Sequence, residues 1–423
     1  MTFHFLLVLP SIMFYTETKG TEKQKMSLDF TAVATQVIRM ISGLKEKRAE
    51  QSQHLDYALA TINNPPIDLD DLKNKIKAAK TTWLVAEITE ALSKTYPLPP
   101  SPPDFSVIAA DGSHIDVDRH QSTHCYLINI GTVTLTYGSQ PDAALNSTPH
   151  LYADDNDLVI THPTNGREQA VEGTVLGVKR SVEECKALVA LAAALPPQNP
   201  ALALLDGTLI LWGLEAYPDF VTDALLVNGM LKCLDELKKL NKERRLALAS
   251  YISYPRSTDV LNVLRVAVCP NDIPDCDKQC PPAHGKDCAG LNGVRDRDIF
   301  MDLLKDGERS ALFISPSKVV KDYYNDHKVY FFYLRVEDEI ARVEIPQWTA
   351  EDKDLLDLTH SLIYDQCRRG QGYPVALSES HEQAVVTGAD RENFREFIES
   401  TLAEENLPSA TSGKSLSKKT RWV

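Results

Sequence analysis

Two apolar stretches of the 423-residue sequence decide the fold: FSVIAADGS at residues 105–113 and ALALLDGT at residues 201–208. Each has the pattern of a buried strand that ends in Asp-Gly followed by Ser or Thr. The glycine after each aspartate lets the chain turn tightly and leaves the carboxylates of Asp111 and Asp206 accessible. Sites in open α/β sheets form where strands end, so the pair indicates a site. The alternative is that both Asp-Gly pairs are ordinary turns.

Hydrophobic periodicity outside these stretches predicts a mixed α/β sheet with helices on its faces. The first strand is expected at 105–110 and the next at 124–139, the latter as one bent strand or two. Further strands are expected at 158–162, 201–207, 244–253, 310–315 and 328–346. Helices are expected at 28–61, 72–94, 175–195, 219–240, 351–369 and 391–404, with a further one beginning near residue 257 and another short element at 381–386.

Composition shifts divide the chain into successive regions. Residues 1–25 are apolar at first, but they lack a basic start and a clear cleavage site, and their apolar run is too short to cross a membrane. Met26 resembles a natural start, so residues 1–25 are expected to be a disordered extension or an over-called start, and the protein is expected to be cytoplasmic. The regions that follow are a helical region (26–95), a proline-rich connector (96–104), the main domain (105–406) with a cysteine-rich insertion (269–293), and a disordered basic tail (407–423).

The formal net charge of −14 limits how the protein could meet a nucleic acid. An acidic chain binds phosphates only through a local basic surface or through metal ions that bridge carboxylates to phosphates. Two neighbouring carboxylates repel each other unless a cation lies between them, and Mg²⁺ or Mn²⁺ prefers oxygen ligands. Asp111 and Asp206 therefore point to a divalent-metal site that could hold a phosphate and activate water.

Three further side chains could complete such a site. In the helix expected at 175–195, Glu184 lies at the edge of the apolar stripe while Glu183 points away from it, so Glu184 is the preferred third carboxylate. His381 could ligate a metal or transfer a proton, although a surface histidine is the simpler interpretation. Tyr251 follows another apolar run, where a half-buried tyrosine at a strand end is common.

The order of motifs resembles the NurA-domain nucleases. These motifs are VIAADGS, YLINIG, KRSVEE, LLDGTLI, YISYPRSTDVLNVLR, DRDIF and GYPVALSESHE, and they run from about residue 105 to the last helix near residue 404. The resemblance implies a ribonuclease-H-like core, a ring-shaped homodimer and DNA cleavage with Mn²⁺, with Mg²⁺ as the alternative ion. It also implies work in DNA-end resection and repair beside a HerA-type hexameric ATPase that translocates DNA.

Site residues follow from the resemblance position by position. The catalytic residues of the family fall on Asp111, Glu184 (or, less well, Glu183), Asp206, Tyr251 and His381. Of these, Asp111, Glu184, Asp206 and His381 would bind metal. The implied activity is 5′–3′ exonuclease or endonuclease cleavage of single- and double-stranded DNA, with no membrane association.

The cysteine-rich insertion is not part of this family pattern. Its cysteines, Cys269, Cys276, Cys280 and Cys288, have irregular spacing without a Cys-x-x-Cys pair. Four thiols in twenty residues could hold a structural Zn²⁺. An iron–sulfur cluster and a loop of unligated thiols are the alternatives.

Two other functions are compatible with parts of the sequence. A non-catalytic subunit that clamps DNA and regulates a HerA-like ATPase would need the same fold without the chemistry, and the intact Asp111 and Asp206 favour the nuclease. A phosphotransferase with an aspartate nucleophile usually needs Asp-x-Asp, whereas the second position after the aspartate is Ser113 in one motif and Thr208 in the other.

Overall fold

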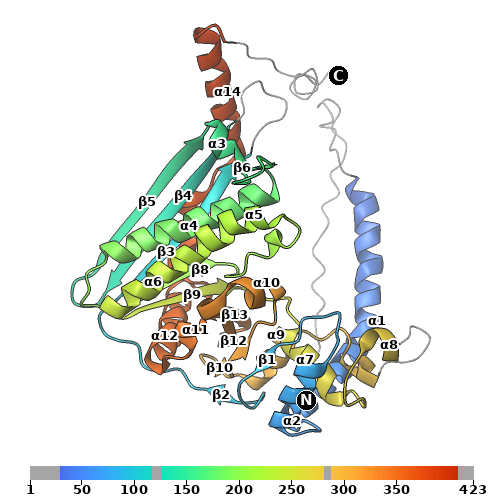
Figure 1. The fold of residues 1–423 in the computed structure, drawn as a ribbon. Helices are drawn as coiled ribbons and strands as arrows, with labels where there is room; N and C mark the ends of the chain where they lie inside the picture. Colours follow the sequence, from blue (N-terminus) through green and yellow to red (C-terminus); the bar gives the residue numbers. More distant parts are fainter. Residues whose placement is uncertain (1–28, 117–124, 281–286, 408–423) are drawn as a thin grey trace, which may run out of the picture. The chain divides into compact units, whose positions relative to one another are not determined.

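The computed structural model describes residues 29–116, 125–280 and 287–407 (Figure 1). The extension predicted at 1–25 and residues 408–423 of the predicted tail lie outside these ranges. The chain divides into two compact units, residues 1–50 and 51–423. In the first unit the described part is the beginning of helix α1 (Phe30–Asn63), and the second unit contains everything discussed below.

A mixed sheet organises the second unit, with its main strands in the order β1-β11-β12-β13-β9-β8-β3-β4-β5. The strands that form the site half of the sheet are β3 (Phe105–Ile115), β4 (Tyr126–Tyr137), β5 (Asp142–Tyr152), β8 (Ala201–Asp206) and β9 (Leu246–Ile252). Here β5, β4 and β3 pair antiparallel, whereas β3, β8 and β9 run parallel. The parallel connections pass through α4 (Thr174–Ala194) and α6 (Leu231–Glu243). This arrangement confirms the predicted ribonuclease-H-like mixed sheet.

The other half of the sheet is antiparallel. It comprises β1 (Glu87–Ile88), β2 (Thr95–Tyr96), β10 (Arg309–Ser310), β11 (Phe313–Ile314), β12 (Val329–Val336) and β13 (Glu339–Pro346). Strand β13 joins the halves by pairing antiparallel with β9. A separate small pair is formed by β6 (Val159–Thr161) and β7 (Glu168–Ala170).

Alternating side chains of the central strands supply two cores, one on each face. From β3, Ile108 and Ala110 join the core under α4 and α6, while Val107 and Ala109 join the core under α12 (Lys353–Arg369) and α13 (Val375–Ala384). Figure 1 shows α4 and α6 lying across the first face. Since period-two alternation continues along a strand, Asp111 and Asp206 belong to the α12–α13 face.

Further helices complete the unit. They are α2 (Leu69–Ala78), α3 (Asp155–Leu158), α5 (Asp219–Thr222), α7 (Asp259–Val268), α8 (Cys276–Gln279), α9 (Asp296–Leu303), α10 (Lys318–Tyr323), α11 (Gln347–Ala350) and α14 (Gly388–Glu404). A π-helical segment (Asp223–Met230) joins α5 to α6, so the helix expected at 219–240 is one continuous helical run. A third core forms where α7 and α9 pack with the antiparallel strands.

Three expectations about local structure are wrong. The second N-terminal helix ends at Ala78 rather than near residue 94, because the segment after it becomes extended and β1 pairs with β11. Strand β3 does not end before Asp111 but continues to Ile115, because β4 pairs with it along its whole length. Residues 142–152, for which no strand was predicted, form β5.

No helix within the described residues is long and apolar enough to cross a membrane.

Candidate active site

The two aspartates of the opening motifs lie at one level of adjacent parallel strands. The register pairs Ala110 of β3 with Leu205 of β8, so the next position places Asp111 beside Asp206. Asp206 is the last residue of β8, and beyond it only β4 continues beside β3. The structure therefore brings these carboxylates together at the point where the sheet loses a strand.

His381, on helix α13, contacts Asp111 of β3. Its Nδ1 lies 2.7 Å from Asp111 Oδ2, while Asp111 Oδ1 accepts a hydrogen bond of 2.7 Å from the Gly112 N–H. Since a carboxylate accepts, Nδ1 carries the shared proton and Nε2 remains the open ring nitrogen. The histidine side chain is 61% exposed, so this nitrogen can reach a ligand from solvent.

A glycine on the neighbouring strand makes that contact possible. Gly131 of β4 lies opposite Asp111 in the register. A Cβ at this position would lie only 2.2 Å from the Ser380 carbonyl oxygen and 2.4 Å from the Ala384 nitrogen, both in the backbone of α13. Only a residue without a side chain lets α13 lie this close to the sheet. The position of His381 therefore depends on Gly131.

The two tyrosines near Asp206 differ in where their hydroxyls point. Tyr251 is the register partner of Asp206, but it is fully buried and its hydroxyl lies 3.7 Å from Cys367 Sγ in the core. The ring of Tyr373 stacks edge-on against Tyr251 at 5.5 Å, and the Tyr373 hydroxyl donates to Asp206. The structure thus brings Tyr373, not the Tyr251 hydroxyl, to the carboxylate.

Burial raises the pKa of Asp206 above its ordinary value. The Tyr373 hydroxyl opposes this shift, and the charge of Asp111 adds to it. Lesser lowering effects come from the Gly207 N–H and from His381. The site thus holds two carboxylates that repel each other across adjacent strands.

Glu184 reaches the same strands from α4. Its carboxylate lies against Gly112, where an added Cβ would be 2.8 Å from Glu184 Oε1. The Arg180 Nε stands 3.0 Å from the same oxygen. Burial nevertheless outweighs the guanidinium and, together with the charges of Asp111 and Asp206, raises the pKa of Glu184 to about 8. Near neutral pH this carboxyl therefore holds its proton.

Glu183, the less favoured alternative, points elsewhere. It pairs with Lys186 at 2.9 Å and lines a separate cavity with Asp157 and Lys179. The geometry therefore favours Glu184 over Glu183 as the third carboxylate.

Glu344 of β13 holds the loop after Asp206 through hydrogen bonds. Gly207 has a φ of +85°, a left-handed conformation that glycine adopts without cost. Glu344 Oε2 then accepts from the Thr208 hydroxyl at 2.7 Å and the Leu209 N–H at 3.0 Å. Arg342 donates to the other Glu344 oxygen at 3.0 Å and to Asp259 at 2.6 Å. This buried chain, the Arg342 network, fixes the turn that presents Asp206.

Oxygen donors of this kind suit a hard divalent cation. Asp111, Asp206 and Glu184 supply the carboxylates that Mg²⁺ and Mn²⁺ prefer, and His381 adds an imidazole nitrogen beside them. Within the described residues, no three Asp, Glu, His or Cys side chains already stand as a ligand set. Glu184 would have to lose its proton and turn from Arg180 to join one.

The sequence patterns did not single out Tyr373, Gly131 or the Arg342 network. Tyr373 lies inside the quoted GYPVALSESHE motif, so its position eight residues before His381 was available as a signal. Nothing in the pattern around Gly131 distinguishes a close helix contact from a strand bend. Arg342 and Glu344 alternate with apolar residues and so look like the polar face of a strand.

Comparison with known proteins identifies the family. The NurA domain family model matches residues 105–386, which is most of the chain. A search of curated proteins gives no match. The family predicted from the ordered motifs is thereby confirmed.

Two solved structures with related chain traces show only distant similarity. One is an Argonaute from Aquifex aeolicus, with 10% identity and a TM-score of 0.25, covering 66% of this chain and 28% of the Argonaute. The other is LC9-RNase H1, a type 1 RNase H with the type 2 active-site motif, with 8% identity and a TM-score of 0.19, covering 39% of this chain and 70% of the RNase H. At these TM-scores neither carries an argument about the site.

Proposed function

Because the chain belongs to the NurA-domain family, a family of nucleases, we propose that it is a divalent-metal-dependent deoxyribonuclease. One observation carries the proposal: Asp111 and Asp206 share one level of adjacent parallel strands, with His381 on Asp111. All three residues lie within the segment that matches the family.

Asp111, Asp206, Glu184 and His381 would hold Mn²⁺ or Mg²⁺. A bound metal of this kind polarises the scissile phosphodiester and lowers the pKa of a water molecule. Asp111 and Asp206 supply the negative charge that keeps the cation in place. His381 offers Nε2 for the metal or for a proton, while Nδ1 stays oriented by Asp111. Tyr373 fixes the Asp206 carboxylate through its hydroxyl.

The finer parts of the proposal rest on the family alone. We propose DNA, single- or double-stranded, as the substrate, with cleavage from 5′ ends or within strands. A homodimer and a HerA-type ATPase partner in DNA-end processing belong to the same proposal, as does a place in the cytoplasm.

The test is cleavage of end-labelled linear DNA, single- and double-stranded, with Mn²⁺, Mg²⁺ or EDTA. We expect metal-dependent cleavage in the wild type and a loss of at least about 100-fold in Asp111→Asn and in Asp206→Asn, the range for removing a group that stabilises transition-state charge. The matched control is Asp302→Asn, because Asp302 is an exposed aspartate on α9.

Two outcomes would count against the proposal. Cleavage that survives both substitutions would mean contamination or a different site. A folded protein that binds DNA but never cleaves it, even with a HerA-type partner present, would favour the non-catalytic clamp.

A further inference from the structure

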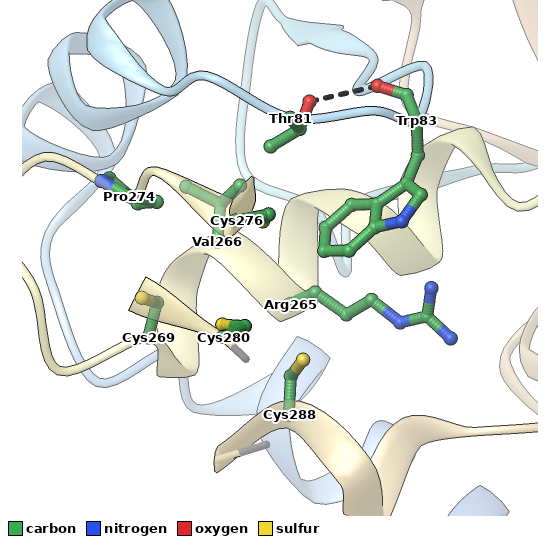
Figure 2. A pocket seen from close by; sticks show the side chains of 9 residues that line it. All are labelled: Thr81, Trp83, Arg265, Val266, Cys269, Pro274, Cys276, Cys280 and Cys288. Atoms are coloured by element: carbon green, nitrogen blue, oxygen red, sulfur yellow. Dashed lines mark hydrogen bonds between the residues drawn. The ribbon is translucent and has the colours of Figure 1, made fainter. Parts of the chain in front are cut away.

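Four cysteines of the insertion converge on one cavity (Figure 2). Cys269 follows the last residue of α7, Cys276 begins α8, Cys280 follows α8, and Cys288 lies in a 3₁₀ turn (Asp287–Leu291). These segments are separate in sequence, yet all four side chains line the same space. The fold therefore brings the four cysteines to one cavity although their spacing in the sequence is irregular.

The cavity has the size of a single ion. Its volume is about 20 Å³, slightly more than the ~10–15 Å³ that one water molecule needs. The remaining walls are largely apolar: Val266, Pro274 and the indole of Trp83, with Arg265 beside them. The space fits one metal ion surrounded by sulfur.

Polar side chains also lie beside this cavity. The side-chain amide of Asn271 donates to Cys269 Sγ at 3.7 Å. The guanidinium of Arg265 stacks on Trp83 at 5.3 Å, and its Nε is buried without a hydrogen-bond partner among the described residues. Thiolates are the form of cysteine that binds metal.

The insertion has little else to hold it together. Its regular structure is the four-residue α8 and a five-residue 3₁₀ turn, and of its described apolar side chains only Pro274 and Leu291 are buried. Hydrogen bonds anchor it at the edges, from the Lys80 N–H to the Pro274 carbonyl and from the Cys276 N–H to the Lys80 carbonyl. Long segments without a core of their own are uncommon in compact domains. A metal cross-link supplies what the missing core does not.

We propose that Cys269, Cys276, Cys280 and Cys288 bind one structural Zn²⁺ ion. Each thiol gives up its proton to form a zinc–sulfur bond in a tetrahedral Cys₄ site. No three of the described thiols already stand in ligating geometry, so binding requires rotation of the cysteine side chains into the cavity. The bound ion would fix the insertion against the end of α7. This site is independent of the nuclease chemistry.

The experiment measures metal content in the full-length protein purified without chelators. We expect about one zinc per chain by elemental analysis, and near zero in the variant carrying Cys→Ser at all four positions. The matched control is Cys125→Ser, because Cys125 is a buried cysteine outside the insertion. Replacing zinc with Co²⁺ in the wild type gives a second readout: the visible spectrum of cobalt in a tetrahedral thiolate site.

The two readouts protect the test against a misfolded variant. If the fourfold variant does not fold, the cobalt spectrum of the wild type and the zinc content of the four single Cys→Ser variants decide. Wild-type protein without bound zinc, or zinc retained in the fourfold variant, would overturn the proposal. Iron with acid-labile sulfide in place of zinc would also overturn it, in favour of an iron–sulfur cluster.

Discussion

Two groups of three carboxylates lie on the sheet or on helices packed against it, and the protein surrounds them with different numbers of hydrogen-bond donors. The strand-end carboxylates are Asp111, Glu184 and Asp206, and the carboxylates in and beside the Arg342 network are Asp259, Asp296 and Glu344. Each group has one arginine, and all three carboxylates of the second group are buried, whereas Asp206 of the first group is exposed. They differ in how many donors the protein directs at them.

In the second group nearly every oxygen has a protein donor. Arg342 donates hydrogen bonds to Asp259 and Glu344, and its guanidinium stacks on Phe331 at 3.7 Å. Asp296 accepts from the N–H groups of Val260 at 3.1 Å and Leu261 at 2.7 Å, and from the Tyr333 hydroxyl at 2.6 Å. This group is complete without a ligand.

The pKa values record the difference. Asp296 is fully buried, and its burial and the charge of Asp259 raise its pKa only to about 6, because three donors oppose the shift. Glu184 retains some exposure, yet its pKa rises to about 8. The strand-end carboxylates have fewer protein donors, which leaves oxygen atoms for the proposed cation.

The largest effect on the free energy of unfolding is expected for Arg342→Met, which tests the difference between the two groups of carboxylates. It leaves Asp259 and Glu344 buried without their cation, so we expect the free energy of unfolding to fall by about 3–5 kcal/mol. Arg180→Met, the matched change in the other group, should cost much less, because Glu184 already holds a proton near neutral pH. Urea denaturation of both variants measures this, and equal losses would contradict the distinction.

Gly131→Ala tests whether the close approach of α13 to the sheet is needed to place His381 beside Asp111. The added methyl would collide with the α13 backbone, so α13 must shift and His381 must move from Asp111. We expect a loss of about 1–3 kcal/mol in stability, as for other overpacked sites, and a clear fall in cleavage. Thermal unfolding and DNA cleavage are the measurements. Gly388→Ala is the control, because a Cβ there meets nothing within 4 Å. Unchanged activity in Gly131→Ala would separate His381 from the chemistry.

Glu184→Gln tests how the stability of the protein depends on pH through the Glu184 carboxyl. The folded-state pKa of Glu184 is raised from 4.5 to about 8, so the native state binds more protons than the unfolded state between those values. This contribution to stability is complete below about pH 4.5 and is lost as the pH rises through about 8. In EDTA at pH 8, Glu184→Gln should therefore be more stable than the wild type, by about 1–2 kcal/mol.

Urea midpoints from pH 5 to 9 provide the check on Glu184. Saturating Mn²⁺ should reverse the order, because only the carboxylate can bind the ion. Parallel pH profiles of the variant and the wild type would show that Glu184 titrates normally.

The smallest expected effect separates the two tyrosines. Tyr373→Phe removes a donor from Asp206, raises the pKa of that carboxyl further, and should lower cleavage by about tenfold, the value of one hydrogen bond to a charged group. The acid limb of the pH–rate profile should move to higher pH. Tyr251→Phe removes only a contact with Cys367 and should have less effect on cleavage. The reverse ranking would restore Tyr251 as the tyrosine at the site.

Sequence patterns predicted β8, β9 and the buried part of β3 well, because these segments are apolar runs bounded by polar residues. The same patterns led to Asp206 at the end of β8 and to helix α4 with Glu184 at the edge of its buried face. They misplaced the end of β3, because strand length depends on the pairing partner, and β4 is longer than β8.

The remaining parts of the site depend on contacts between distant segments. Gly131 meets α13 about 250 residues later, and Glu344 of β13 binds the loop after β8. No local periodicity encodes such a pair. The direction of the Tyr251 hydroxyl is also decided by its neighbours, Cys367 and Tyr373, rather than by its own segment.

Strand β5 has a consequence for how the sheet opens. All its residues except Tyr152 are exposed, and only β4 pairs with it in the described part of the chain. A strand that buries so little gains almost nothing from packing, so its backbone hydrogen bonds are the ones that break first. Amides shared by β4 and β5 should exchange with deuterated solvent through local opening, long before those between β3 and β8. The sheet can therefore loosen at this edge while Asp111 and Asp206 keep their places.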